Sequence, residues 1–137
     1  MTAIIDNFIS VYKNMNSNNI DSVRSLYSED ITFIDPFHEI HGLSSLINYF
    51  TNLYENVEDC RFDFSDIYAK DKSAMITWDM TFKHRNMSKY EIHVPGCTQM
   101  RFEKNISYHR DYFDAGKMVY ENIPLVGSII RHIKKKV

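Results

Sequence analysis

The chain has 137 residues, 44% of them hydrophobic and 14% aromatic, which is enough for one domain, residues 1–137, with a sizeable core. Its formal net charge is −2, and the 16 Lys and Arg residues are scattered except at the C-terminal end, which argues against a nucleic-acid partner. Cys60 and Cys97 form no CxxC motif. This pattern, with no apparent signal peptide or bilayer-spanning run, predicts a reduced, cytoplasmic protein.

Apolar residues recur at spacings of three and four in three stretches of the first half of the chain, which predicts helices over residues 4–15, 20–27 and 43–54. The polar run NSNN at 16–19 is expected to end the first helix. A short strand over 31–34 separates the second helix from the third.

From residue 57 the apolar period changes to two, which predicts long antiparallel strands. Two strands should meet near 70–72, a third should run over 90–103, and a fourth over 106–113. Pro95-Gly96 interrupts the third strand and predicts a bulge that bends the sheet. Helices followed by an antiparallel sheet indicate an α+β fold, in which three N-terminal helices cover a curved sheet shaped as a cone.

Asp35 stands where the strand over 31–34 ends, before Pro36 and between Phe33 and Phe37. Pro36 has no N–H and favours extended geometry in the residue before it, so Asp35 should close the strand. A carboxylate partly shielded by such rings has its pKa raised and can serve as a proton-transfer base. The alternative is an Asx turn, in which the side chain bonds only nearby N–H groups.

The residues beyond 117 form a C-terminal helical extension, 117–137, with apolar residues followed by a basic end. Pro124 should begin the second of two short helices. That helix suits a lid across the cone mouth, which we favour because its cations cluster where they complement the helix dipole. Lying on an anionic membrane surface is the less favoured alternative.

Three stretches resemble the nuclear-transport-factor-2-like cone fold in its SnoaL-like branch: NNIDSVRSLYSEDITFIDP, the HG before the third helix, and ISYHRDYFD. The resemblance spans about residues 3 to 116 and implies that fold. The family includes polyketide cyclases, ketosteroid isomerases and limonene epoxide hydrolases, so the resemblance implies several chemistries rather than one.

Asp35 matches the proton-shuttling base of ketosteroid isomerases by this resemblance. Their oxyanion-holding Tyr falls at Val11, with Tyr12 one residue along, and their protonated Asp falls near Thr98, which argues against steroid isomerisation by that set. In polyketide cyclases an Asp of the last strand is the acid and base, and Asp111 is its nearest match, ahead of Asp114.

Trp78, if it faces the cone, shares that face with residues of three strands and with Tyr49 of the third helix. We expect the cone to be lined by Trp78, Ile76, Met80, Phe82, Thr98, Met100, Phe102, His109, Asp111 and Phe113. Such walls suit a small apolar or aromatic ligand, although many of these side chains could simply fill the core. His109 and Asp111, two ionisable groups on one strand face, indicate either a structural pair or proton chemistry.

Asp35, His38, Glu39 and His41, with His93 or His109, could supply metal ligands, but their spacing matches no metal motif, and no metal or cofactor is predicted.

Two functions remain open: an acid–base isomerase, cyclase or hydrolase of a small hydrophobic substrate, and a non-catalytic ligand- or partner-binding module. The predicted catalytic residues are Asp35, His109 and Asp111. The predicted substrate-binding residues are Tyr12, Phe37, Tyr49, Trp78, Thr98, Met100 and Phe113. A weakly charged outer sheet face, with Met75, Thr77 and Thr81, predicts a homodimer.

Overall fold

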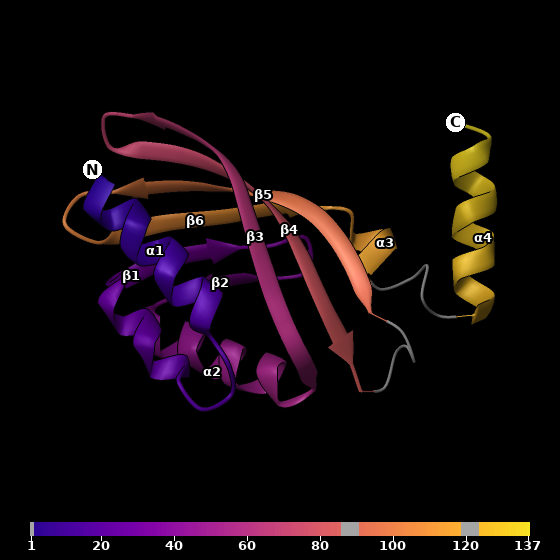
Figure 1. Ribbon diagram of the computed structural model, residues 1–137, viewed down its shortest axis with the longest axis horizontal. Helices are drawn as coiled ribbons and strands as arrows, with labels where there is room; N and C mark the ends of the chain where they lie inside the picture. Colours follow the sequence, from indigo (N-terminus) through magenta and orange to yellow (C-terminus); the bar gives the residue numbers. More distant parts are fainter. Residues whose placement is uncertain (1, 86–90, 119–123) are drawn as a thin grey trace.

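A curved six-stranded sheet organises the computed structural model, which describes residues 2–85, 91–118 and 124–137. Figure 1 shows the N-terminal helices lying together on one side of the sheet. In chain order the elements are α1 (Thr2–Asn14), the 3-10 helix η1 (Ile20–Ser25), β1 (Tyr27–Ile34), β2 (Glu39–His41), α2 (Leu43–Glu55), β3 (Val57–Lys70), β4 (Ser73–His84), β5 (Ile92–Phe102), β6 (Ile106–Phe113), α3 (Ala115–Met118) and α4 (Pro124–Lys135).

Helix α1 buries Ile5, Phe8 and Tyr12, which recur at the spacing of one helix face. Its end is fixed by the polar run that follows, because the Asn19 side chain accepts the Asn16 N–H at 2.7 Å and donates to the Asn14 carbonyl at 2.7 Å. These bonds satisfy groups that the end of the helix would otherwise leave unpaired. The predicted first helix and its stop are confirmed.

Helix α2 likewise buries one apolar face, formed by Leu43, Leu46, Phe50 and Tyr54. Gly42 precedes it with φ of 92°, a left-handed conformation that glycine adopts without steric penalty. The third predicted helix is therefore confirmed, and its first turn starts where the HG pair placed it.

The second predicted helix is wrong beyond Ser25, because η1 ends there and Tyr27 already belongs to β1. Tyr27 pairs with Ile106 of β6, far along the chain. That long-range pairing outweighs the local helical period of the segment, and it makes β1 four residues longer at its start than the expected strand over 31–34.

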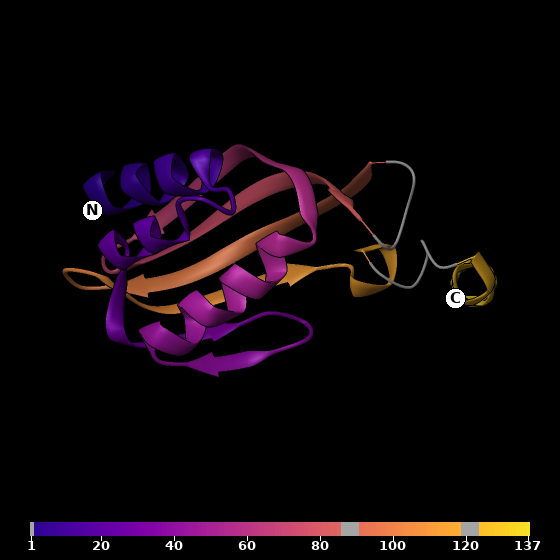
Figure 2. The same cartoon turned by 90° about the horizontal axis from the view of Figure 1, so that it is seen from below.

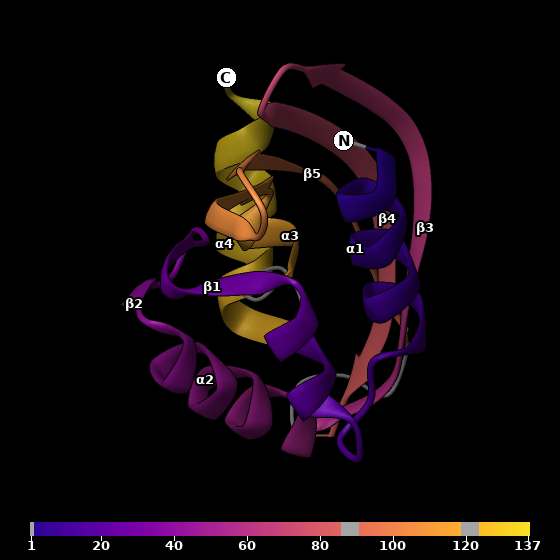
Figure 3. The same cartoon turned by 90° about the vertical axis from the view of Figure 1, so that its left-hand side faces the viewer.

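The strand order is β2-β1-β6-β5-β4-β3, and every neighbouring pair is antiparallel except β1 and β6, which run parallel. The sheet is therefore mixed and open, whereas the sequence predicted an antiparallel one. Figures 2 and 3 show α1 and α2 against the concave side of the curved sheet. The α+β class with helices covering one face is confirmed.

The predicted bulge at Pro95-Gly96 is wrong, since β4 and β5 stay in register from Ser73↔Arg101 to Phe82↔Ile92. Register shifts occur elsewhere: twice in the pairing of β3 with β4, one of them near Asp59, whose φ is 51°, and once each in the pairings of β1 with β6 and of β5 with β6. Gly96 serves a packing role, because an added Cβ would lie 2.7 Å from the Tyr112 carbonyl oxygen and 2.8 Å from Trp78 Cζ3.

Pro124 begins α4, as predicted. The lid interpretation of the tail is not supported: Ile129 and Ile133 are more than half exposed, and Figure 1 shows α4 standing apart from the sheet. Lys134 of α4 reaches Asp114 at 2.7 Å. The tail residues Val119 and Ile123, and the side chains of Leu125, Val126 and Ile130, lie outside what the structure describes.

None of the helices in the described ranges is long and apolar enough to cross a bilayer. Among the described residues the core forms two clusters, one between the helices and the sheet and one built by β4 and β5 around Trp78. Phe62 and Phe64 of β3 pack against both clusters.

Candidate functional site

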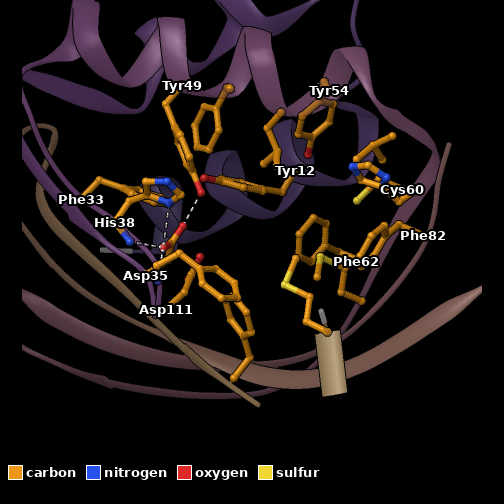
Figure 4. A pocket seen from close by; sticks show the side chains of 18 of the residues that line it. Tyr12, Phe33, Asp35, His38, Tyr49, Tyr54, Cys60, Phe62, Phe82 and Asp111 are labelled. Atoms are coloured by element: carbon orange, nitrogen blue, oxygen red, sulfur yellow. Dashed lines mark hydrogen bonds and ion pairs between the residues drawn. The ribbon is translucent and has the colours of Figure 1, made fainter. Parts of the chain in front are cut away.

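A cavity of about 230 Å³ draws its walls from both core clusters (Figure 4). Its lining is mainly aromatic and aliphatic and includes two carboxylates, Asp35 and Asp111. The lining residues are Tyr12, Phe33, Asp35, Phe37, His38, Tyr49, Phe50, Leu53, Tyr54, Val57, Cys60, Phe62, Trp78, Met80, Phe82, His84, Asp111, Phe113 and Met118. Its volume lies below the roughly 300–1,000 Å³ of sites for drug-sized ligands, so it suits a smaller molecule.

Asp35 combines the two alternatives left open by its sequence. One oxygen, Oδ1, accepts the N–H groups of Phe37 and His38, each at 2.8 Å, which is an Asx turn. The other oxygen, Oδ2, accepts a short hydrogen bond from the Tyr49 hydroxyl. The carboxylate, with a side chain only 6% exposed, nevertheless lines the cavity, so the turn places it there rather than in solvent.

Tyr49 and His38 complete this end of the cavity, and Figure 4 shows both directed at the Asp35 carboxylate. The imidazole of His38 is half-exposed, with Nδ1 at 3.5 Å from Asp35 Oδ1. Burial, followed by the hydrogen bond to Asp35, raises the pKa of Tyr49 well above its usual range. The Tyr49 hydroxyl is therefore a persistent donor to this carboxylate.

Asp111 is held by two buried groups from neighbouring strands. Its Oδ1 accepts the Thr98 hydroxyl at 2.6 Å and lies 2.7 Å from His109 Nε2. Trp78 Nε1 donates to Thr98 Oγ1 at 2.9 Å, and since an indole N–H can only donate, the Thr98 proton is free to go to Asp111. Oδ2 of Asp111 receives no hydrogen bond from the described residues, while the residue lines the cavity.

His109 is wholly buried behind Asp111, and its second ring nitrogen continues the hydrogen bonding. Nδ1 lies 2.8 Å from the Tyr27 hydroxyl, which lies 2.6 Å from the Tyr12 hydroxyl. Burial raises the pKa of both tyrosines well above the usual value. The bonded side chains Asp111, His109, Tyr27 and Tyr12, called the buried chain below, start and end at cavity-lining residues.

Seven of the ten residues predicted for the site line the cavity: Tyr12, Asp35, Phe37, Tyr49, Trp78, Asp111 and Phe113. His109, Thr98 and Met100 do not. His109 and Thr98 stand behind Asp111 and hold it, whereas Met100 is fully buried in the helix-side core cluster. Strand alternation identifies the inward face of a strand but not how deep in the cone each residue lies. His109, Thr98 and Met100 were therefore predicted as cavity-lining residues although they lie behind the lining.

Tyr27 is the main functional candidate that the sequence analysis missed. Its apolar spacing assigned it to a helix, and only its pairing with Ile106 places it beside His109. Phe33 and Phe62 were also overlooked as wall residues, although their alternation within predicted strands was a usable signal. His38 was considered solely as a metal ligand.

The metal alternative gains no support from the part of the chain that is described, in which no three His, Cys, Asp or Glu side chains are grouped to hold an ion. His41 pairs with Glu39 at 2.9 Å on β2, where both side chains are exposed. His93 instead bonds Thr81, with Nδ1 at 3.0 Å from the hydroxyl. Thr81, expected on the outer face, is itself buried.

A family model described as the SnoaL-like domain matches residues 9–106. The chain belongs to the SnoaL-like domain family. This confirms the resemblance inferred from the three sequence stretches. No curated protein sequence matches this SnoaL-like chain closely enough to count as a relative.

Solved structures share the fold at low sequence identity. A protein of ketosteroid isomerase-like fold from Catenulispora acidiphila, in complex with trimethylamine, is 16% identical with TM-score 0.75, covering 89% of this chain and 92% of its own. A candidate SnoaL-like polyketide cyclase from Shewanella putrefaciens is 13% identical with TM-score 0.71, covering 85% and 91%. An LEH-like epoxide hydrolase from M. tuberculosis is 16% identical with TM-score 0.70, covering 94% of each chain. At these identities the likeness shows the fold alone.

Proposed function

We propose that this SnoaL-like protein is an acid–base enzyme that moves a proton on a small, mostly apolar molecule, with Asp111 as the base. The observation that carries the proposal is the placement of Asp111. One of its oxygens is fixed by Thr98 and His109, and the residue lines an aromatic cavity. A carboxylate held in position with one oxygen left for a ligand is arranged for proton abstraction.

The walls of the cavity support a neutral or weakly polar substrate. The described lining residues include two carboxylates and neither Lys nor Arg, so an anionic molecule would be repelled. Rings on several sides favour a flat or cyclic molecule through apolar contact. A small cyclic carbonyl compound fits these requirements, because the C–H next to a carbonyl is acidic enough for a carboxylate base.

Asp35 is assigned a supporting role. Its two oxygens already accept three hydrogen bonds, from two backbone N–H groups and from Tyr49. Both oxygens of Asp35 are thus engaged, whereas Oδ2 of Asp111 receives no hydrogen bond from the described residues. We therefore assign proton abstraction to Asp111 and substrate positioning to the Asp35 and Tyr49 pair.

The test measures deuterium exchange of small cyclic ketones, beginning with cyclohexanone, in D₂O by proton NMR. The wild-type protein should accelerate exchange of the protons next to the carbonyl. Asp111→Asn should reduce that acceleration by about 100-fold or more, since a positioned general base contributes about 10²–10⁴-fold. Asp79→Asn is the matched control, because Asp79 is an exposed carboxylate on β4 outside the cavity.

A non-catalytic ligand-binding module is the second candidate, favoured by the mainly apolar lining and by the saturated hydrogen bonding of Asp35. The same experiment separates the two. Cyclohexanone that binds with no exchange above the buffer rate supports binding alone. Exchange that is unchanged in Asp111→Asn would refute the assignment of the base.

A further inference from the structure

We propose that the buried chain is a proton relay, in which Tyr12 donates a proton to the ligand, Tyr27 passes one on, and His109 supplies it while paired with Asp111. The relay rests on the proposed function, because it adds the acid to a reaction whose base is Asp111. It would give the cavity two proton-transfer points connected through the protein interior.

The geometry of the buried chain is continuous. The separations are 2.6 Å between the Tyr12 and Tyr27 hydroxyls, 2.8 Å from Tyr27 to His109 Nδ1, and 2.7 Å from His109 Nε2 to Asp111 Oδ1. All are within normal hydrogen-bonding distance. A structural His and Asp pair requires one of these contacts, whereas this chain extends through two further groups and returns to the cavity at Tyr12.

The middle of the chain is shielded from water. His109 is 0% exposed and Tyr27 is 2% exposed. The rings of Phe8 and Phe33 pack against the imidazole, with centroids at 5.7 and 4.5 Å. A proton on His109 therefore has Asp111 and Tyr27 as its hydrogen-bonded routes in and out.

We call the relay empty when His109 is neutral. In this state each hydrogen bond of the buried chain is donated in the direction of Asp111. The carboxylate accepts the His109 Nε2–H, so Nδ1 is an acceptor and the Tyr27 hydroxyl donates to it. Tyr27 then accepts from Tyr12, and this bond acts to lower the pKa of Tyr27 against the larger effect of burial. Tyr12 has no hydrogen left for the cavity in this state.

In the loaded state His109 also carries a proton on Nδ1, and the ring is an imidazolium beside the Asp111 carboxylate. Nδ1–H donates to Tyr27, Tyr27 donates to Tyr12, and the Tyr12 hydroxyl hydrogen faces the cavity. The two states differ by one proton and by the direction of two hydroxyl bonds. Heavy atoms need not move, since each contact has the same two partners in both states.

The reaction balances from the loaded state. A ligand C–H bond breaks as Asp111 Oδ2 takes the proton, and the carbonyl oxygen takes the Tyr12 proton to form an enol. Tyr12 is reprotonated by Tyr27, and Tyr27 by His109 Nδ1. The protein has then moved one proton from His109 to Asp111. Return of both protons to their original atoms gives exchange in a simple ketone. In a ligand whose enol is conjugated with a second C=C bond, delivery of the Asp111 proton to the far end of that dienol gives an isomer, and in both cases the loaded state is restored.

The kinetic test compares two probes in D₂O. Cyclohexanone exchange needs a base and a donor to the oxygen, whereas nitroethane exchange needs mainly the base, because a nitro group stabilises the carbanion itself. Tyr12→Phe and Tyr27→Phe should slow cyclohexanone exchange by about 100-fold and leave nitroethane exchange within about threefold of wild type. Tyr108→Phe is the matched control, since Tyr108 is a partly buried tyrosine of β6 that lies outside both the cavity lining and the buried chain.

A second measurement needs no turnover. A ketone can only accept a hydrogen bond, so binding of saturating cyclohexanone should protonate His109 Nδ1, seen as a shift of its ¹⁵N resonance, whereas methylenecyclohexane should not. Tyr27→Phe should abolish that response. An unchanged Nδ1 signal in the ketone complex, or wild-type ketone exchange in Tyr27→Phe, would overturn the relay. Asp111→Asn should instead slow the exchange of both cyclohexanone and nitroethane, because it removes the proposed base.

Discussion

His109 Nε2 lies 2.7 Å from Asp111 Oδ1, and the imidazole is fully buried while the carboxylate remains 18% exposed beside the cavity. The pair therefore joins the interior to the cavity wall. Removal of Asp111 would leave the buried His109 Nε2 without its hydrogen-bond partner, whereas removal of His109 leaves Asp111 Oδ1 with the Thr98 hydrogen bond.

His109→Ala should destabilise the fold by about 2–4 kcal/mol, because it opens a cavity and removes one hydrogen bond each from Tyr27 and Asp111. Urea denaturation gives the free energy of unfolding. His93→Ala, on the exposed side of β5 with one bond to Thr81, should cost under about 1 kcal/mol. Equal losses in the two variants would show that the buried chain contributes nothing specific to stability.

Gly96→Ala should destabilise by about 1–3 kcal/mol, because the new methyl group would lie 2.7 Å from the Tyr112 carbonyl oxygen and 2.8 Å from Trp78 Cζ3. Trp78 is the only tryptophan, so a displaced indole should alter the intrinsic fluorescence directly. Cys97→Ala, one position along β5, is the control and should leave the spectrum unchanged. An unaltered emission spectrum in Gly96→Ala would contradict this account of Gly96.

Helices and strands with a strong local hydrophobic period could be predicted from the sequence. The buried chain could be predicted only in part. Tyr12, His109 and Asp111 each followed from helical spacing or strand alternation. Tyr27 did not, because it joins them through a parallel pairing of β1 with β6, between residues about eighty apart, and such pairing leaves no local pattern. The choice between the turn and cavity roles of Asp35 also required Tyr49, fourteen residues away.

Tyr12, Tyr27, Tyr49 and Tyr54 should resist alkaline titration, because burial raises the pKa of each above the ordinary value of 10. A raised folded-state pKa contributes stability that is present below pH 10 and is lost as pH rises above it. Absorbance at 295 nm should show these tyrosines ionising only together with loss of circular dichroism.

Tyr54→Phe should remove one tyrosine from the absorbance change that accompanies the loss of circular dichroism. Any absorbance change at lower pH should be unaltered. If every tyrosine ionised near pH 10 while the circular dichroism stayed native, the burial of Tyr12, Tyr27, Tyr49 and Tyr54 would be disproved.

Cys60 should react slowly with iodoacetamide at pH 8, because burial raises the pKa of its thiol to about 11 in spite of the opposing Tyr54 hydrogen bond. Only about one thiol in a thousand is then ionised. Burial also raises the pKa of the Cys97 thiol, but by less, so Cys97 should be labelled first, as mass spectrometry of Cys60→Ala and Cys97→Ala would show. Denaturant should equalise the two rates, and faster labelling of Cys60 in the native protein would contradict the prediction.

We propose that the outer face of the sheet mediates a homodimer. Tyr68 and Tyr112 are 65% and 43% exposed there, and the ladder places Met75 opposite Tyr68 and Gln99. Exposed apolar and aromatic side chains gathered on one face are typical of self-complementary interfaces. Sedimentation velocity at micromolar concentration should therefore show a dimer.

Met75→Arg should weaken that dimer at least about tenfold, because two like charges would face each other across a twofold interface. Lys13→Glu on α1, away from the outer sheet face, is the control and should leave the sedimentation coefficient unchanged. The cavity lies on the opposite, helix-covered side, so the monomeric variant should retain its ketone exchange. A wild-type protein that sediments as a monomer throughout this range would refute the proposed interface.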